Sequence, residues 1–532
     1  MLGRRTEQRS LFEVDVAYPG LMPVGSFYAF LAKERATLFR DEEFATLYHG
    51  KLGRPSVPPS LLAMALILQT YDRVSDEEAF ERGSFDLRWK VALGIPVDEV
   101  PFAKSTLQLF RAQLMVHELG RLAFERSLTA ARKRGHLKGR MRLAVDTTNV
   151  LGRGAVKDTY NLLGDGIVLV MRALAAQDGV AVGAWAAGTE AGKLEHYISG
   201  SSLKGEADLD WDDAEERKRL LAGIVSDADT LLKAVRTARA KVSEGSAEDA
   251  GLVAAAATLS QVLLQDIDRN ADGPGLHDGV AKDRMPSVHD PEMRHGHKSA
   301  QKRFNGHKAQ IAVDTESQLI TAAAVLAGNA ADNEGTLALI EASEKSTGAK
   351  AAETIGDCAF GDGQTRAAFA EAGRTLVAKV PAMANRGRFP KTDFVIDLAA
   401  KTCVCPAGAS GIARYSRQHD LRGFRFELAT CAVCPLRSQC VGGQTGRAIA
   451  VHPQEALLQK ARAFQKSDAF RPFKAARQVV EHRIARLVQL GLRQARYVGR
   501  AKTLFQLQMA ATVANLTLLA GREEPTNGLQ AA

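Results

Sequence analysis

The start of the chain carries the apolar periodicity of several short helices. One apolar stripe has spacings of three and four residues, which predicts a helix, and its members are Leu61, Leu62, Met64, Ala65 and Leu68. Ser75-Asp-Glu-Glu has the pattern of a capping box and predicts the start of a second helix. A third helix is expected over residues 85–93, and Ser105 is expected to cap a fourth over 106–115. Short helices between tight turns predict a compact α domain over residues 46–120, a construction shared by helix-turn-helix DNA-binding domains and by unrelated bundles.

The period of the pattern changes after this domain. Residues 121–142 stay helical, but Leu143-Ala-Val-Asp146 is a short β-like run that ends in a carboxylate. Residues 166–175 favour a second strand. We therefore expect 121–187 to hold the first part of a sheet-containing core.

Residues 188–290 differ in composition from both neighbouring segments. They are rich in Ala, Glu, Lys and Asp, and long helices are expected over 217–242 and 247–268, ending in a loop at 272–275. A local acidic patch precedes these helices, and its members are Asp208, Asp210, Asp212, Asp213, Glu215 and Glu216. The segment is predicted to be a helical insertion that continues into a basic loop.

Strand patterning returns over residues 291–389, which are expected to complete the core. Residues 308–313 and 319–326 flank a short polar turn, as the two strands of a hairpin do. The other expected elements are a helix over 335–344, a strand over 354–357, a helix over 364–372 and a strand over 375–380.

The remaining segments frame this core. A cysteine-rich insertion is expected over residues 390–445, and a helical C-terminal part of the core over 446–522. Residues 1–45 are expected to be a short lead-in, and 523–532 a polar tail.

Composition narrows the class of protein. Apolar residues make up 45% and charged residues 25% of the chain, as in a folded globular protein. The net charge of +9 favours an anionic partner, with nucleic acid the commonest and a generic basic enzyme the alternative. The apolar stretches at 61–68 and 503–520 are too short or too polar to predict a membrane span, and no signal peptide pattern opens the chain. We therefore expect a cytoplasmic protein without a membrane partner.

Three carboxylates are the candidates for chemistry. Asp146 and Asp357 each follow an apolar run at a strand end, where a side chain can reach a metal ion in a cleft, although strand-end aspartates also simply begin turns. Glu481 is the single carboxylate between residues 469 and 522, where every other charged side chain is Lys or Arg. It is either a cation ligand beside a phosphate-binding surface or the partner of Arg477 in an i,i+4 ion pair.

Cysteines and a basic loop are two further candidate sites. Five of the six cysteines cluster, and they are Cys403, Cys405, Cys431, Cys434 and Cys440. Their spacing makes structural zinc a candidate, with buried inert thiols the alternative, and Cys358 is expected to be a small core residue. The basic loop is expected either to contact the DNA backbone or to be a solvated surface, and its members are Arg294, Lys298, Lys302, Arg303 and Lys308.

Several motifs, in order, resemble those of the DDE transposases of bacterial insertion sequences, in the subgroup with an N-terminal transposase-associated helical domain. The N-terminal motifs are Lys51-Leu-Gly-Arg-Pro-Ser, Leu61-Leu-Ala-Met-Ala-Leu, Ser75-Asp-Glu-Glu and Ser105-Thr-Leu. The central motifs are Asp283-Arg-Met-Pro-Ser, Asp290-Pro-Glu, Lys302-Arg-Phe-Asn-Gly-His-Lys and Gly356-Asp-Cys-Ala-Phe-Gly-Asp-Gly. The last are Gly491-Leu-Arg and Tyr497-Val-Gly-Arg, followed by an apolar helix with Asn515.

The resemblance implies an α/β (α+β) fold with a ribonuclease-H-like mixed sheet. It places an acidic triad on Asp146, Asp357 and Glu481, which would bind two Mg²⁺ or Mn²⁺ ions, with Arg477 beside the phosphate. The family pattern Tyr-x2-Arg-x3-Glu-x6-Lys is met only at Arg477 and Glu481. Lys474 replaces the Tyr and Val488 the Lys, so Arg486 or Arg493 is a candidate for the missing cation. Rivals for the second acid are Asp290, Asp332 and Asp362.

The resemblance also implies partners and a cellular place. Double-stranded DNA is expected as the substrate, both the terminal inverted repeats of the element and the target, bound by a homodimer near the nucleoid. Further expected DNA contacts are Arg486, Arg493 and Arg496. The expected activity is DNA strand cleavage and strand transfer. The alternatives are a DNA-binding regulator without catalysis and a metal-dependent nuclease that does not join strands.

Overall fold

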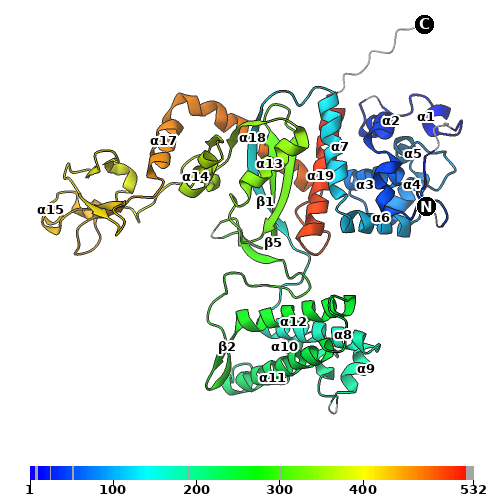
Figure 1. Cartoon of the computed structure of the whole chain (residues 1–532), viewed down its shortest axis with the longest axis horizontal. Helices are drawn as coiled ribbons and strands as arrows, with labels where there is room; N and C mark the ends of the chain where they lie inside the picture. Colours follow the sequence, from blue (N-terminus) through cyan, green and yellow to red (C-terminus); the bar gives the residue numbers. More distant parts are fainter. Residues whose placement is uncertain are drawn as a thin grey trace, which may run out of the picture.

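The computed structural model describes residues 1–5, 10–23, 25–50, 53–189, 192–200, 202–299 and 301–522. A mixed sheet lies at the centre, a helical bundle on one side, a cysteine-rich lobe on the other and a second helical lobe below it (Figure 1). Lys51, Leu52 and the tail at 523–532 lie outside the described residues. The first N-terminal motif is therefore only partly covered.

The N-terminal bundle begins earlier than the sequence pattern predicts. Its elements are α1 (Val14–Ala17), α2 (Phe27–Leu38), η1 (Asp41–Leu47), α3 (Pro59–Asp72), α4 (Asp76–Phe85), α5 (Leu87–Leu93), α6 (Lys104–Val116) and α7 (Gly120–Lys133). The capping box at Ser75 is confirmed, because its hydroxyl accepts from the backbone N–H of Glu78 and the Glu78 carboxylate accepts from that of Ser75. The predicted cap at Ser105 is wrong: α6 starts one residue before it, and Ala103 occupies the N-cap without a side-chain hydrogen bond.

The central sheet has six strands, four joined by antiparallel pairing and two more added in parallel at one edge. Its strands are β1 (Met141–Leu151), β4 (Arg294–His297), β5 (Arg303–Asp314), β6 (Ile320–Ala327), β7 (Ala351–Ile355) and β8 (Leu376–Val377). β5 lies antiparallel to β1, β6 and β4, whereas β7 lies parallel to β1 and β8 parallel to β7. The predicted hairpin is confirmed as β5 and β6. The order β6–β5–β1–β7–β8 is the ribonuclease-H-like mixed sheet that the resemblance implies.

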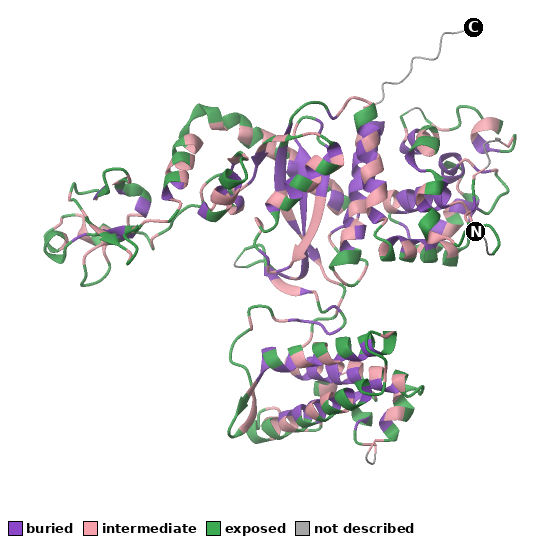
Figure 2. Ribbon diagram, in the orientation of Figure 1, coloured by how far each residue is buried: buried purple, intermediate pink, exposed green. Residues whose placement is uncertain are grey.

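Helices from distant parts of the chain pack on this sheet. Those in direct contact with its strands are α13 (Thr336–Thr347), α18 (Arg471–Gln489) and α19 (Arg500–Ala520). α7 packs on α13 and α19. The remaining helices of this part are η4 (Cys358–Phe360), α14 (Gly363–Glu371), α17 (Glu455–Lys466) and η6 (Asp468–Phe470), of which α17 contacts α14 and η6, and η6 contacts α18. α19 contacts α7, α3 and β6, and the buried Asn515 amide donates to the carbonyl and accepts from the N–H of Ile320 at the start of β6. One continuous hydrophobic cluster therefore joins the N-terminal bundle to the sheet (Figure 2).

The lower lobe is inserted between β1 and β5 and has its own core. Its elements are α8 (Thr159–Gln177), α9 (Val182–Ala187), η3 (Glu195–Tyr197), α10 (Leu203–Glu206), α11 (Ala214–Arg239), α12 (Ala247–Asp266), β2 (Ile267–Asn270) and β3 (Gly273–Leu276). The strand predicted over 166–175 is wrong, because these residues lie in α8. Asp158 caps that helix, and its apolar residues pack on α11 and α12 rather than on the sheet. The insertion thus begins about thirty residues before the predicted boundary at 188.

The cysteine-rich lobe leaves the core after β8 and returns at α17. Its elements are η5 (Lys391–Asp393), β9 (Val395–Asp397), β10 (Thr402–Val404), β11 (Ile412–Tyr415), β12 (Leu421–Arg425), α15 (Leu428–Ala432), α16 (Arg437–Cys440) and β13 (Ala448–Ala450). Its fully buried core is small and consists of Phe394, Cys403, Phe424, Phe426 and Ile449.

Two helices, α12 and α19, are long and apolar enough by composition to cross a membrane. In α19, however, 72% of the apolar window is already buried inside the protein, and α12 packs against α8 in the lower lobe. Core helices of folded proteins have the same length and composition, so these two helices are only weak evidence for a membrane span.

Candidate active site

Strand register brings two of the predicted carboxylates together. In the parallel pair of β1 and β7, Ala144 lies opposite Ile355. Asp146 and Asp357 each follow two residues later, so their backbones leave this pair at the same level of the sheet. β7 ends at Ile355, and Asp357 is the N-cap of η4, where its carboxylate accepts a hydrogen bond of 2.8 Å from the N–H of Ala359.

The environment of Asp146 disfavours its charge. Its side chain is 19% exposed, and burial raises the pKa of its carboxyl group to about 6. A 2.7 Å hydrogen bond from the backbone N–H of Thr147 opposes this rise, while the negative charges of Asp357 and Asp332 add to it. The pKa therefore also shows that three aspartates share one electrostatic environment.

Arg477 connects this pair of strands to the third predicted carboxylate. α18 contacts β1 and β5, and from this helix one guanidinium nitrogen of Arg477 lies 3.7 Å from Oδ2 of Asp146. The other terminal nitrogen donates to Oε1 of Glu481, one turn further along the helix. The Glu481 side chain is 48% exposed, so it stands at the open side of the cluster. The i,i+4 ion pair between Arg477 and Glu481 that the sequence suggested is present, and the same guanidinium also pairs with Asp146.

The rival carboxylates occupy different positions. Asp332 belongs to the cluster, since its charge acts on Asp146, but its Oδ1 also accepts a 2.8 Å hydrogen bond from the ammonium of Lys308. Asp362 caps α14 and accepts from the N–H groups of Gln364 and Thr365. Asp290 is fully buried 3.5 Å from His307, a pairing that the sequence analysis missed; no pattern in the sequence links these two residues.

The basic residues expected to contact DNA fall into two groups. Exposed side chains remain at Lys298, Lys302 and Arg303, and the half-buried Arg486 donates to the side-chain oxygen of Gln489. The others are engaged within the protein: Arg294 donates to the carbonyls of Pro291 and Met293, Lys308 to Asp332, Arg493 to Asn149 and Arg496 to Asp76. Arg493 and Arg496 thus join the segment after α18 to β1 and to the N-terminal bundle.

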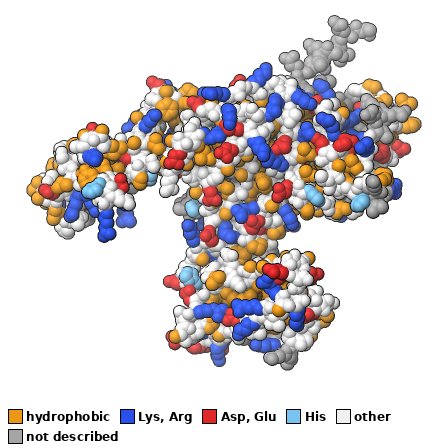
Figure 3. Space-filling view, in the orientation of Figure 1, with side chains coloured by type: hydrophobic (Ala, Val, Ile, Leu, Met, Phe, Trp, Pro, Cys, Tyr) orange, Lys and Arg blue, Asp and Glu red, His pale blue; other side chains and the backbone are white. Residues whose placement is uncertain are grey.

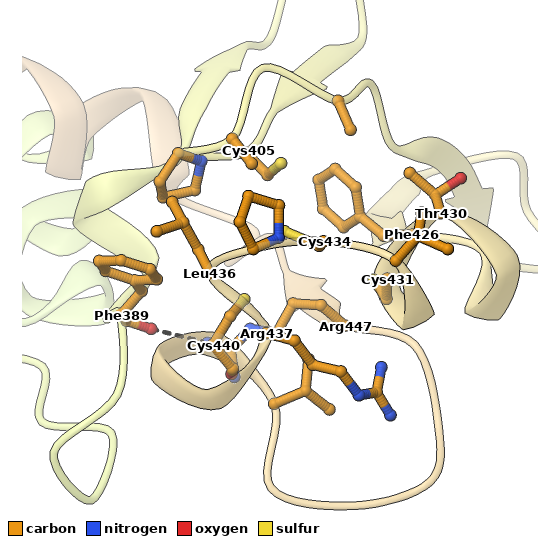
Figure 4. A pocket seen from close by; sticks show the side chains of 16 residues that line it. Phe389, Cys405, Phe426, Thr430, Cys431, Cys434, Leu436, Arg437, Cys440 and Arg447 are labelled. Carbon is orange, nitrogen blue, oxygen red and sulfur yellow. Dashed lines mark hydrogen bonds between the residues drawn. The ribbon is translucent and has the colours of Figure 1, made fainter.

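Four of the five clustered cysteines line one cavity of about 200 Å³ in the cysteine-rich lobe (Figure 4). They are Cys405, Cys431, Cys434 and Cys440. Burial raises the pKa of the Cys440 thiol, and the neighbouring thiols of Cys431, Cys405 and Cys434 add to the rise while Arg447 opposes it. Cys403 is instead fully buried in the small core of the lobe, where burial raises its pKa to about 11.

Two further findings concern the metal-binding candidates and the sixth cysteine. Within the described ranges, no three His, Cys, Asp or Glu side chains are already arranged to hold a metal ion. The expected core position of Cys358 is wrong: this thiol is exposed, because it follows the strand end in η4.

Two segments of the chain, one near each end, match known protein families. Residues 25–113 match the family described as Transposase domain (DUF772), and residues 404–520 match the family described as Transposase DDE domain. No curated protein and no solved structure matches the chain. Arg477 and Glu481 lie inside the second matched segment, whereas Asp146 and Asp357 precede it. The chain thus matches a transposase domain model near each end of its described structure, which is consistent with a DDE transposase.

Proposed function

We propose that this transposase cuts and joins DNA strands by metal-dependent phosphoryl transfer at Asp146, Asp357 and Glu481. The observation that carries the proposal is the meeting of Asp146 and Asp357 at one level of the sheet, with Arg477 linking Asp146 to Glu481. The proposed ligands thus come from β1, the N-cap of η4 and α18.

The donor set fits two Mg²⁺ or Mn²⁺ ions, which prefer carboxylate oxygens. Burial, and then the charges of Asp357 and Asp332, raise the pKa of Asp146, and a bound divalent cation would favour its charged form. When bound, such ions activate an attacking hydroxyl and stabilise the leaving oxygen of the phosphate. The ligands would be Asp146, Asp357 and Glu481. Asp332 would not be a ligand, because its carboxylate is already paired with the ammonium of Lys308.

The proposed reaction consists of two successive phosphoryl transfers at the same site. In the first, water attacks a phosphodiester at the end of the element, loses its proton to solvent, and leaves a 5′-phosphate and a 3′-OH. In the second, that 3′-OH attacks a target phosphodiester and displaces the target's own 3′-oxygen. Arg477 positions Glu481 and supplies positive charge beside the reacting phosphate, where preorganised charge stabilises the transition state.

The wider proposal concerns partners and place. The substrate is double-stranded DNA bound by a homodimer in the cytoplasm, near the nucleoid. The exposed Lys298, Lys302 and Arg303 contact the backbone, and the N-terminal bundle recognises the ends of the element. Because that bundle shares its hydrophobic cluster with the sheet, truncation before residue 121 would expose the core, and surface substitutions are the sound test of recognition.

We also propose that one Zn²⁺ is held by Cys405, Cys431, Cys434 and Cys440. Their shared cavity supports this set, and the separate burial of Cys403 argues against that residue as a ligand. The thiols would close around the ion as thiolates, and the small core of the lobe would gain stability from it.

A supercoiled plasmid that carries the element tests the catalytic proposal. Glu481→Gln should abolish nicking and joining in Mg²⁺ or Mn²⁺ while DNA binding persists. Asp468→Asn is the matched control, because this nearby carboxylate is almost fully exposed and forms an ion pair with the equally exposed Arg471. Wild-type protein that binds without nicking would be a regulator, and one that nicks without joining would be a nuclease; either result contradicts the proposal.

A further inference from the structure

The cysteine-rich lobe carries a sheet face that its own core does not use. In the three-stranded sheet β11–β12–β13, Ala413 pairs with Phe424 and Phe424 with Ile449, and this row faces the small core. The alternate positions face outward, because successive side chains of a strand point to opposite sides. The outward positions are Ile412, Arg414, Gly423, Arg425, Ala448 and Ala450.

This outer face is shallow and positively charged. Gly423 lies opposite Arg414, and a Cβ there would stand 2.2 Å from the carbonyl oxygen of Ile449, so the position admits only glycine. Arg414 and Arg425 are diagonal neighbours about 7 Å apart, with the small residues Gly423, Ala448 and Ala450 and the exposed Ile412 beside them. Both side chains are exposed.

Charge is one-sided along this part of the chain. Between residues 401 and 426 the basic side chains are Lys401, Arg414, Arg417, Arg422 and Arg425, against one carboxylate, Asp420. Asp420 lies at the hairpin tip, where it accepts from the hydroxyl of Ser416. Figure 3 shows Lys and Arg side chains gathered along the underside of this lobe.

The exposed arginines of β11, β12 and the turn between them have no protein partner among the described residues. In the described part of the chain, no hydrogen bond or ion pair occupies the guanidinium groups of Arg414, Arg417, Arg422 or Arg425. In the same lobe, Arg437 and Arg447 donate to backbone carbonyls and are structural. In the core, Arg374 is paired with Glu344. Lys401 stands over the exposed ring of Tyr415 at 5.6 Å, which keeps its charge at the edge of the face.

We infer that the outer face of β11–β13 binds the phosphate backbone of duplex DNA, and that the cysteine-rich lobe is a second DNA-contact arm outside the catalytic core. DNA is the occupant because unpaired arginines on a flat face complement a line of phosphates, and because the substrate under the proposed function is DNA. Such contacts fix position on the duplex without reading base sequence.

The test measures binding of the full chain to a random-sequence DNA duplex over a range of salt concentrations. The triple variant Arg414→Gln/Arg417→Gln/Arg425→Gln removes two charges from the outer face and one from the turn between β11 and β12. The control Lys218→Gln/Arg236→Gln/Lys241→Gln removes three exposed charges from the lower lobe. Losing three phosphate contacts should reduce the salt slope of log Kd by about two to three and weaken binding at least about tenfold at low salt. The control should change neither.

Folding and charge are separated by a second variant. Arg414→Lys/Arg417→Lys/Arg425→Lys keeps the charges and should retain most of the binding. Unchanged affinity and slope in the glutamine variant, or equal losses in the control, would overturn the inference. The proposed catalysis would survive that result, because nicking by the wild type is measured separately. Conversely, an inactive wild type with a salt slope that depends on this face would contradict the catalysis and support the arm.

Discussion

The sheet core and the cysteine-rich lobe solve the same problem, the placing of chemical groups, in opposite ways. In the core, a hydrophobic cluster shared by three parts of the chain fixes β1, β7 and α18, and these elements then hold carboxylates against their mutual repulsion. In the lobe, five residues make the buried core, and four thiols surround a cavity beside it. In the core, hydrophobic packing therefore holds the carboxylates in place. In the lobe, we expect the reverse, with a metal ion bound by the thiols holding the fold in place.

The largest expected effect is a loss of strand cleavage by the core without a loss of its fold. Asp146→Asn should reduce strand cleavage by about a thousandfold or more, since a metal ligand is lost from the transition state. The apo fold should persist, because the substitution relieves repulsion from Asp357. Cleavage of plasmid DNA with parallel measurement of DNA binding checks this, and near-normal cleavage would remove Asp146 from the site.

The same assay separates the two candidates for the second acid. Asp357→Asn should be as inactive as Asp146→Asn, whereas Asp332→Asn should retain substantial activity, because Lys308 already neutralises Asp332. The opposite pattern would assign the second acid to Asp332.

The second prediction concerns the lobe. Protein purified without chelator should contain about one zinc per chain, and Cys434→Ser should lose it. Because zinc binding is coupled to folding in small domains, the lobe of this variant should become sensitive to protease while the core stays resistant. Elemental analysis and limited proteolysis measure the two effects. A zinc-free wild type with an intact lobe would show that apolar packing alone suffices.

The third prediction uses the pKa of Asp146. Because its folded-state pKa of about 6 exceeds the ordinary value near 4, the protonated form favours folding. This contribution is present below about pH 4 and is lost as the pH rises through about 6, a change of about 3 kcal/mol. In metal-free buffer, Asp146→Asn should thus be more stable than the wild type at pH 8 and similar at pH 4. Thermal unfolding of the core at both pH values tests this, and equal differences at the two would contradict it.

The smallest expected effect sharpens the distinction between the thiols. Cys403→Ala removes a buried sulfur from the small core and should cost about 1 kcal/mol of the lobe's stability. The zinc content should stay at one per chain, since this thiol does not line the cavity. A loss of zinc equal to that of Cys434→Ser would make Cys403 a ligand.

Local pattern was enough for much of the core. The capping box at Ser75 and the β5–β6 hairpin follow from residue types and spacing, and both are confirmed. The acidic candidates Asp146 and Asp357 were likewise visible as carboxylates after apolar runs. The apolar run at 166–175 misled the prediction, because a continuous apolar segment fits a buried strand and a buried helix equally well.

The sequence by itself determined the identity of the groups: the acids, the basic helix around Glu481, the clustered thiols and the motifs of a DDE transposase. Tertiary structure alone decided how they are grouped. It paired Arg477 with Asp146, gave Asp332 to Lys308, took Arg493 and Arg496 into the protein, and set Cys403 apart from the other thiols. These contacts join residues up to several hundred positions apart, and strand register and helix packing, not local periodicity, bring such residues together.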